Sequence, residues 1–267
     1  MSYVPSREEY LFDSLGFVHF SKLLPADWVE EVRVGLEARI KEAKSVKVPF
    51  LDVTPYGGLR LLKSINLMKL LEKVLGSGFR LDHAFIRLQP DSNGVEVSNL
   101  HGGPGAAQGT HLFFNQNGSP FCTQVSVGIP LHAQGGDEGG LVLLPGSHKS
   151  AFAMQGGAVR KHVFEDGYPV ADGALVAPRL EQGDIIAFTE TMIHGARPLK
   201  TTQQRATLYY MFTPGHVSWR RATWAPNIIQ AAILLGLESL LRPAYVAEFT
   251  ETPTAIGGNV PRTRTTW

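Results

Sequence analysis

The sequence predicts a mainly β protein, a double-sheet jelly roll with an N-terminal layer of helices. Two observations carry this prediction. Apolar residues recur with helical spacing in the first part of the chain, whereas from about residue 79 short alternating runs lie between Gly- and Pro-rich turns. Many short strands after a helical front are typical of a jelly roll. The 267 residues suit one domain, with a core over about residues 8–215 and a C-terminal helix and arm over 216–267.

The front of the chain is expected to be helical. Asp27 followed by Glu30 resembles a capping box, and apolar residues recur every four positions from Trp28 to Ile40. This pattern predicts an amphipathic helix that continues toward Lys47.

Two shorter segments also predict helices. Residues 8–20 indicate a short helix broken at Gly16 and followed by a strand, and residues 67–75 indicate a helix stopped by Gly76.

The strand region is clearest over residues 121–131. Apolar side chains alternate there from Phe121 to Leu131, and Gln124, Ser126 and Gly128 fall on the opposite face. Shorter runs at residues 83–88, 141–144, 184–188 and 207–212 complete the predicted strands.

Composition excludes several classes of protein. The 25 Lys+Arg against 24 Asp+Glu give a net charge of +1, which offers no attraction to a nucleic-acid polymer. The single cysteine, Cys122, cannot form an internal disulfide, and the first ten residues lack an apolar signal core. We therefore expect a cytoplasmic protein.

The longest apolar stretch, residues 228–241, is not expected to be a membrane anchor. It is shorter than the roughly 20 residues that span a bilayer, and Gln230 and Glu238 interrupt it. Pro226 and Pro243 bound it as helix-boundary residues do. We expect a helix packed on the body or at a contact between subunits of a homo-oligomer.

Two of the nine histidines lie in unusual surroundings. His101 lies in the glycine-rich segment 99–105, and His194 closes an apolar run that begins at Gly183. The others are expected to be ordinary structural or surface residues: His19, His83, His111, His132, His148, His162 and His216.

Three motifs together resemble a known family. Residues 140–149 read GLVLLPGSHK, Gly183-Asp184 precedes an apolar run, and that run ends in His194-Gly195-Ala196-Arg197-Pro198. In this order they resemble the phytanoyl-CoA dioxygenase branch of the Fe(II)/2-oxoglutarate-dependent oxygenases, over about residues 8–215.

The resemblance implies a cupin-like double-stranded β-helix and an enzyme that uses Fe(II), 2-oxoglutarate and O₂. His101 and His194 match the family's metal-binding histidines, and Arg205 matches the arginine that binds the far carboxylate of 2-oxoglutarate. A guanidinium suits that task because its planar fork of donors fits a carboxylate in two hydrogen bonds. Thr207, on the same predicted strand, is expected to assist.

The chain departs from the family at the third metal ligand. The family motif is His-x-Asp, but here it reads His101-Gly102-Gly103, and glycine has no side chain to bind iron. In the Fe(II)/2-oxoglutarate halogenases the equivalent residue is Gly or Ala, and a halide takes the vacant position. The resemblance therefore implies a halogenase that binds chloride beside Gly103 and chlorinates an unactivated carbon.

Two alternatives stand beside halogenation. A different carboxylate would restore a hydroxylase: Glu190 lies four residues before His194 but would need a loop bend to reach the metal, and Glu96, Asp82 and Asp137 lie near other predicted strands. The other alternative is a non-catalytic binding module, against which the joint presence of His101, His194 and Arg205 argues.

The substrate is expected to be a small molecule. The chain resembles the free-nucleotide halogenases of chlorinated adenosine-type antibiotic biosynthesis, which implies a deoxyadenine nucleotide. An aromatic and basic set would suit a flat anion, and the candidate substrate-binding residues are Arg87, Arg197, Trp219 and Trp224. A carrier protein that delivers the substrate stays an open alternative.

Overall fold

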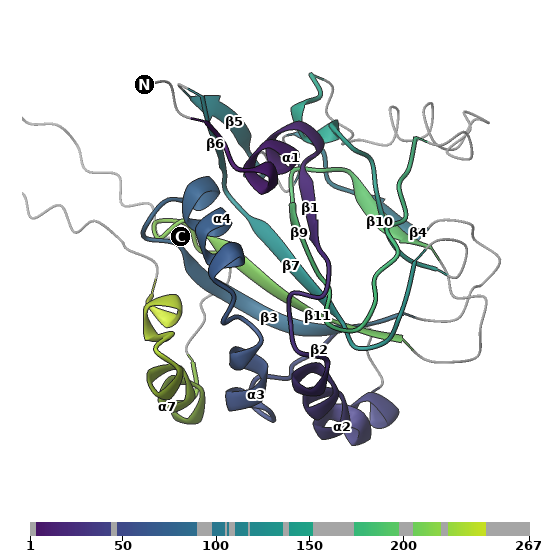
Figure 1. The fold of residues 1–267 in the computed structure, drawn as a ribbon, viewed down its shortest axis with the longest axis vertical. Coiled ribbons are helices and arrows are strands. Elements are labelled where there is room, and N and C mark those ends of the chain that lie inside the picture. Colours follow the sequence, from purple (N-terminus) through teal and green to yellow (C-terminus); the bar gives the residue numbers. More distant parts are fainter. Residues whose placement is uncertain are drawn as a thin grey trace, which may run out of the picture.

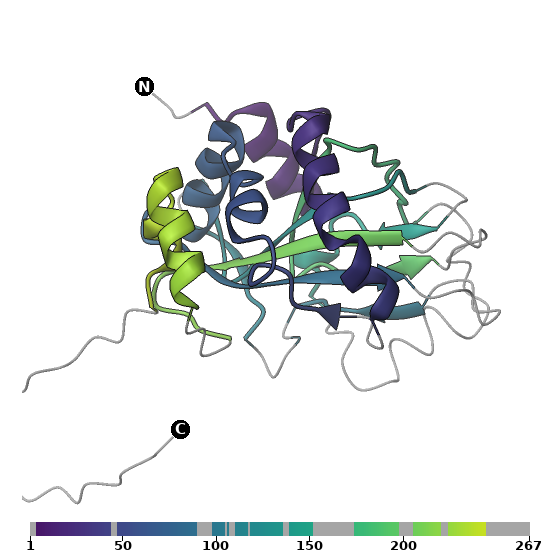
Figure 2. The ribbon, with the colours of Figure 1, turned by 90° about the horizontal axis from the view of Figure 1, so that it is seen from below.

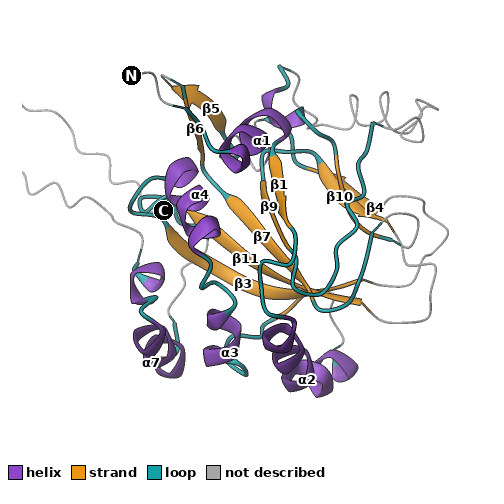
Figure 3. Ribbon diagram, in the orientation of Figure 1, coloured by secondary structure: helices purple, strands orange, loops and turns teal. Residues whose placement is uncertain are grey.

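The computed structural model describes residues 4–43, 47–89, 98–104, 106, 110–116, 118–135, 139–151, 174–197, 205–219 and 224–243. In these ranges, antiparallel strands form two facing sheets and a hairpin, with helices gathered on one side (Figures 1 and 3). The predicted jelly-roll class is thus confirmed. The expected arm at the C-terminus and His162 lie outside the described residues.

The main sheet has six strands in the order β1-β9-β7-β11-β3-β2. All neighbouring strands in it are antiparallel. The strands are β1 (Phe17–Phe20), β2 (Lys47–Val48), β3 (Arg80–Gln89), β7 (Val125–Pro130), β9 (Ile185–Thr189) and β11 (Arg205–Thr213).

The second sheet has three strands, in the order β4-β10-β8, and a separate hairpin pairs β5 with β6. The strands are β4 (Ser98–His101), β8 (Gly140–Leu143), β10 (His194–Arg197), β5 (Phe113–Gln116) and β6 (Ser119–Cys122). The strand predicted over residues 121–131 is wrong in one respect, because β6 and β7 divide it. The Thr123 hydroxyl accepts from the Leu112 N–H and donates to the Thr110 carbonyl, which binds the junction to the loop before β5.

The helices cover the outer face of the main sheet, as Figure 2 shows from below. They are α1 (Arg7–Leu15), α2 (Ala26–Glu42), α3 (Pro55–Arg60), α4 (Ile65–Leu75) and α7 (Pro226–Leu235), with the 3-10 turns η2 (Ser147–Lys149) and η4 (Glu238–Leu241). Among the described residues, no helix combines the length and apolar character that crossing a membrane requires.

Local sequence explains where these helices begin and end. A capping box between Ser6 and Glu9 starts α1, and Gly16 ends it in the left-handed conformation with a φ of 87°. Ser64 caps α4, and Gly76 follows its last residue. Both predicted stops, at Gly16 and Gly76, are confirmed. The expected helix over residues 228–241 is divided at Gly236, which ends α7 with a φ of 68°.

The start predicted for α2 is wrong, although its buried face is confirmed. The helix begins at Ala26 after Pro25, so Asp27 lies within the first turn and cannot cap it. Glu30 instead accepts hydrogen bonds from Arg33 and Gln182. The helix ends at Glu42, well before Lys47, which belongs to β2. Its buried residues are Val29, Val32, Leu36 and Ile40.

Alternation along β11 separates the structural face of the main sheet from its inner face. Leu208, Tyr210 and Phe212 belong to the large core under the helices. Tyr209, between them, packs against the smaller core that joins β8 to β9. Because successive side chains on a strand point to opposite faces, Arg205 shares the inner face with Tyr209.

Candidate metal centre

The structure brings the two predicted metal-binding histidines together at one end of the strands of the second sheet. His101 is the last residue of β4 and His194 is the first of β10, and the two are antiparallel Cα partners. Their ring centroids lie 4.1 Å apart. Two strands that run in opposite directions thus deliver two imidazoles to one place.

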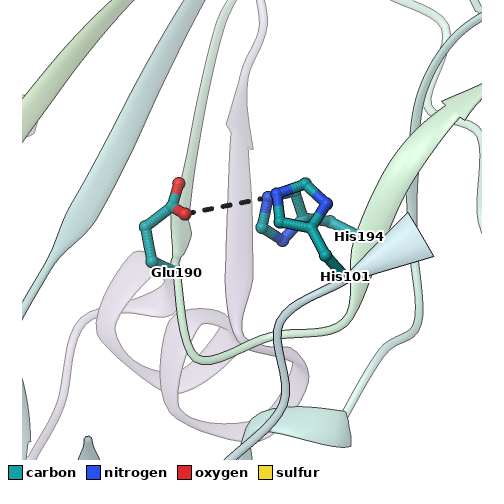
Figure 4. Close-up of side chains that lie close together, drawn as sticks. All are labelled: His101, Glu190 and His194. Atoms are coloured by element: carbon teal, nitrogen blue, oxygen red, sulfur yellow. Dashed lines mark ion pairs between the residues drawn. The ribbon is translucent and has the colours of Figure 1, made fainter. Parts of the chain in front are cut away.

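Glu190 joins this pair from the turn between β9 and β10 (Figure 4). One ligand atom from each of His101, Glu190 and His194 lies within 4.8 Å of the others. The Oε2 atom of Glu190 is 3.8 Å from Nε2 of His194. The loop bend that Glu190 needed in order to reach the histidines is therefore present in the structure.

Hydrogen bonds fix the orientation of His194. Its Nδ1 lies 2.8 Å from the Met192 carbonyl oxygen, an acceptor, so Nδ1 carries the proton and Nε2 is the free acceptor of the neutral ring. Burial lowers the pKa of His194, which favours that neutral form near pH 7. A neutral imidazole with a fixed tautomer is ready to bind a metal.

Glu190 is buried as a carboxylate. The Ser126 hydroxyl on β7 donates to its Oε1, and its backbone N–H donates to the Gln124 carbonyl at 3.2 Å. Burial alone would raise the pKa of Glu190, but the positive charge of His194 in its protonated form and the Ser126 hydroxyl outweigh burial and hold this pKa below its usual value. Metal ligands must be deprotonated, so both residues are in the state that binds a cation.

The predicted cosubstrate residues lie on the inner face of the main sheet. Arg205 begins β11 and is buried, and Thr207 follows it on the same face. The Thr207 hydroxyl accepts a hydrogen bond of 2.9 Å from Nε2 of Gln134. Burial lowers the pKa of His132, and the charges of Arg33 and Arg205 lower it further. The segment after β7 thus places Gln134 and His132 beside the start of β11.

The predicted substrate residues fall in different places. Arg87 is half-buried opposite Thr207, so its side chain shares the inner face of the sheet. Arg197 is three residues after His194 on β10, where alternation turns it to the opposite face. Trp224 lies two residues before α7 and packs against the large core.

Trp219 is linked through His111 to the group formed by His101, Glu190 and His194, which we call the metal-site cluster. Its ring centroid is 4.8 Å from that of His111, and Nε2 of His111 is 3.1 Å from Oε1 of Gln124, whose carbonyl accepts from Glu190. The Trp219 backbone N–H donates to Asp82 at 3.0 Å.

Asp82 lies in a separate charged cluster. The Arg80 guanidinium and Nδ1 of His83 both contact its carboxylate. The other carboxylates considered, Glu96 and Asp137, lie outside the described residues.

Sequence reasoning missed Ser126, Gln124 and His111 as neighbours of the metal-site cluster. A signal existed for the first two, because alternation already placed them away from the core face of their strand. Nothing local in the sequence separates His111 from the other structural histidines.

The middle of the chain, residues 99–207, matches the phytanoyl-CoA dioxygenase (PhyH) family model. This PhyH segment contains His101, Glu190, His194 and Arg205. A search of the curated proteins found no match.

Several solved structures share the fold. HygX from Streptomyces hygroscopicus, with nickel and 2-oxoglutarate bound, superposes with a TM-score of 0.64 at 22% identity over 84% of this chain and 94% of that one. The α-ketoglutarate-dependent epimerase SnoN from nogalamycin biosynthesis gives 0.56 at 17% identity over 79% and 83%. AviO1 from Streptomyces viridochromogenes Tue57 gives 0.55 at 19% identity over 84% and 100%. At these identities the likeness shows the fold.

Proposed function

We propose that this chain is an Fe(II)- and 2-oxoglutarate-dependent oxygenase that acts on a C–H bond of a small molecule. One observation carries the proposal: the ligand atoms of His101, Glu190 and His194 lie within 4.8 Å of one another. Two imidazoles and a carboxylate are the ligand set of non-haem Fe(II) oxygenases. The PhyH match and the metal and 2-oxoglutarate bound to HygX support the same chemistry.

The residues present fit an iron ion. His194 offers an unprotonated Nε2, and Glu190 offers Oε2, because its other oxygen accepts from Ser126. A buried carboxylate is costly unless it is paired or binds a metal. Iron bound there would supply the activation of O₂.

Arg205 and Thr207 are proposed to hold 2-oxoglutarate. A buried guanidinium can bind a carboxylate through two charge-assisted hydrogen bonds, and both residues lie on the inner face of β11. The protein would thus bind the cosubstrate with its own side chains and exclude water from it.

The overall reaction in the hydroxylase form is R–H + O₂ + 2-oxoglutarate → R–OH + succinate + CO₂. One oxygen atom enters the substrate and the other enters succinate. The decarboxylation of 2-oxoglutarate provides two electrons for O₂, and the C–H bond provides the other two.

Halogenation is the second candidate, and Gly103 favours it because this position carries no carboxylate. Its balance is R–H + Cl⁻ + H⁺ + O₂ + 2-oxoglutarate → R–Cl + succinate + CO₂ + H₂O. The proposal would require chloride to bind beside Gly103.

The proposed substrate is a small molecule of secondary metabolism. HygX has been solved with hygromycin B bound, and SnoN with nogalamycin RO, which supports this class. A deoxyadenine nucleotide stays the prediction from the sequence, with Arg87 and Trp219 as the candidates for binding it.

The visible absorption of the anaerobic protein with Fe(II) and 2-oxoglutarate tests the proposal. We expect a charge-transfer band, followed by succinate formation when O₂ is admitted. In Arg205→Ala, the 2-oxoglutarate concentration that half-forms the band should rise by at least about 30-fold, because breaking a buried charge pair costs about 2 kcal/mol or more.

Arg179→Ala is the matched control, since this arginine is 77% exposed. Its half-forming concentration should equal that of the wild type. Absence of the band in the wild type would contradict the proposed function, and an unchanged Arg205→Ala would contradict the cosubstrate assignment.

A further inference from the structure

The inference rests on the proposed function and concerns the third protein ligand of the metal. We infer that Glu190, on the turn between β9 and β10, replaces the carboxylate that the family motif carries at position 103. The third ligand would then come from the turn between β9 and β10 and not from the segment after β4. With three protein ligands in place, the reaction is the oxygen insertion written above, and no chloride is needed to complete the site.

The first argument is the burial of the Glu190 carboxylate. The residue is 9% exposed, and among the described residues its only ion-pair contact within 4.0 Å is with His194. A buried carboxylate without Lys or Arg beside it calls for a cation. The surroundings of Glu190 are therefore those of a metal ligand.

The second argument is the contact between Glu190 and His194. Nδ1 of His194 contacts the Met192 carbonyl oxygen at 2.8 Å, which fixes the ring with its Nε2 on the side of Glu190. Nε2 is 3.8 Å from Oε2 of Glu190, which is beyond hydrogen-bond distance. A cation that lies between the two atoms can contact both of them.

The third argument is that the sheet holds Glu190 from behind. The Ser126 hydroxyl donates to Oε1, and the Glu190 N–H donates to the Gln124 carbonyl at 3.2 Å. Both partners come from β7 or the residues just before it. Oε2 is left as the oxygen that lies nearest His194, so the carboxylate is oriented before any metal binds.

The fourth argument explains the glycines of the motif. A Cβ on Gly102 would lie 2.2 Å from the Met192 carbonyl oxygen and 3.3 Å from that of Glu190. The Gly103 N–H donates to the Thr191 carbonyl at 2.8 Å, with a φ of 91° that other residues rarely adopt. The segment after β4 thus packs backbone to backbone against the turn that carries Glu190.

This packing provides a second explanation for the presence of glycine, and not aspartate, at position 103. In the halogenase interpretation, Gly103 makes room for an anion, and alanine serves there equally well. In the structure, glycine permits the close approach that places Glu190, and alanine at position 103 would disturb that approach. The same substitution therefore separates the two interpretations.

Titration of the full-length protein with Co(II) under anaerobic conditions, followed by its d–d absorption, provides a readout independent of turnover. We expect one Co(II) per chain in the wild type. Glu190→Gln keeps the shape of the side chain and should weaken binding at least 100-fold. Gly103→Ala should weaken it at least 10-fold, because second-shell changes typically cost 10- to 100-fold in metal affinity. Glu181→Gln, a change in an exposed carboxylate, should bind as the wild type does.

The Fe(II)/2-oxoglutarate band with added chloride or bromide completes the test. The inference predicts a band that is indifferent to halide in the wild type. Wild-type affinity in both Glu190→Gln and Gly103→Ala, with a saturable halide shift, would overturn the inference while leaving the oxygenase proposal intact. Failure of the wild type to bind metal would instead overturn the proposed function. Circular dichroism and melting of each variant separate loss of the ligand from loss of the fold.

Discussion

A carboxylate lies beside a histidine at each end of β9, but the two pairs differ in their contacts. Asp184 immediately precedes the strand and contacts His19, and Glu190 immediately follows it and lies beside His194. At the first end the carboxylate and imidazole are 2.9 Å apart, and at the second they are 3.8 Å apart.

The partners of each carboxylate explain the difference. Asp184 accepts from Nε2 of His19 and from the backbone N–H groups of Lys22 and Glu181, at 2.8–2.9 Å. Glu190 accepts one side-chain hydrogen bond, from Ser126, and its Oε2 lies 3.8 Å from Nε2 of His194. The Asp184 end is therefore satisfied and structural, whereas at the Glu190 end we propose that a cation completes the contacts.

The pair formed by Asp82 and His83 belongs with the satisfied kind. Its contact is 2.7 Å, and the other carboxylate oxygen accepts from Arg80 and from the Trp219 N–H. A histidine next to a carboxylate is thus not by itself a sign of a metal. The sign is a carboxylate oxygen and an imidazole nitrogen that lie close together without a hydrogen bond between them.

The largest expected difference between the two ends of β9 is their response to metal. Co(II) at about 100 times its dissociation constant should raise the free energy of unfolding by about 2.7 kcal/mol, because it binds only the folded chain. Asp184→Asn should keep this increment, and Glu190→Gln should lose it at the same Co(II) concentration. Urea unfolding with and without Co(II) measures both, and an equal increment in the two variants would contradict the comparison.

Without metal, Asp184→Asn should lower the free energy of unfolding more than Glu190→Gln does. Asp184→Asn removes the charge from a carboxylate with three donors and is expected to lower the free energy of unfolding by about 2 kcal/mol. Glu190→Gln removes a buried charge that lacks a cation, so the metal-free variant should be as stable as the wild type or more stable. Urea denaturation in the presence of a chelator measures the two values, and a larger loss in Glu190→Gln would reverse the assignment.

Much of the fold could be predicted from local sequence because local rules decide it. Gly16 and Gly76 end helices through backbone conformations that other residues resist, and apolar spacing marked the buried face of α2. The start of α2 was predicted wrongly because Pro25 sets the first turn and Glu30 finds partners outside its own cap.

The metal-site cluster could be predicted only in part, and for a physical reason. His101 and His194 lie in recognisable motifs, so their pairing followed from the family resemblance. The approach of Glu190 depends on a turn whose shape is set by contacts with Gly102 and Gly103, almost ninety residues earlier in the chain. Spacing along one strand carries no information about such a contact.

The smallest expected effect is the pH dependence of the Asp184 end. Burial alone would raise the pKa of Asp184, but hydrogen bonds from the Glu181 and Lys22 N–H groups and from His19 outweigh burial and lower it. A lowered pKa means that the folded state holds the carboxylate more strongly in its charged form. This contribution is fully present above the unfolded-state pKa of about 3.9 and is lost as the pH falls through the folded-state value.

The difference in unfolding free energy between the wild type and Asp184→Asn should therefore shrink as the pH falls below about pH 4. Urea denaturation of both proteins across this range, with a chelator present, measures the difference directly. His19→Gln should reduce the size of the difference without changing the direction of its pH dependence, because two of the three donors to Asp184 are backbone groups that remain. A difference that grew as the pH fell below about pH 4 would show that Asp184 is held protonated in the folded state, and the two ends of β9 could then no longer be told apart by their charge.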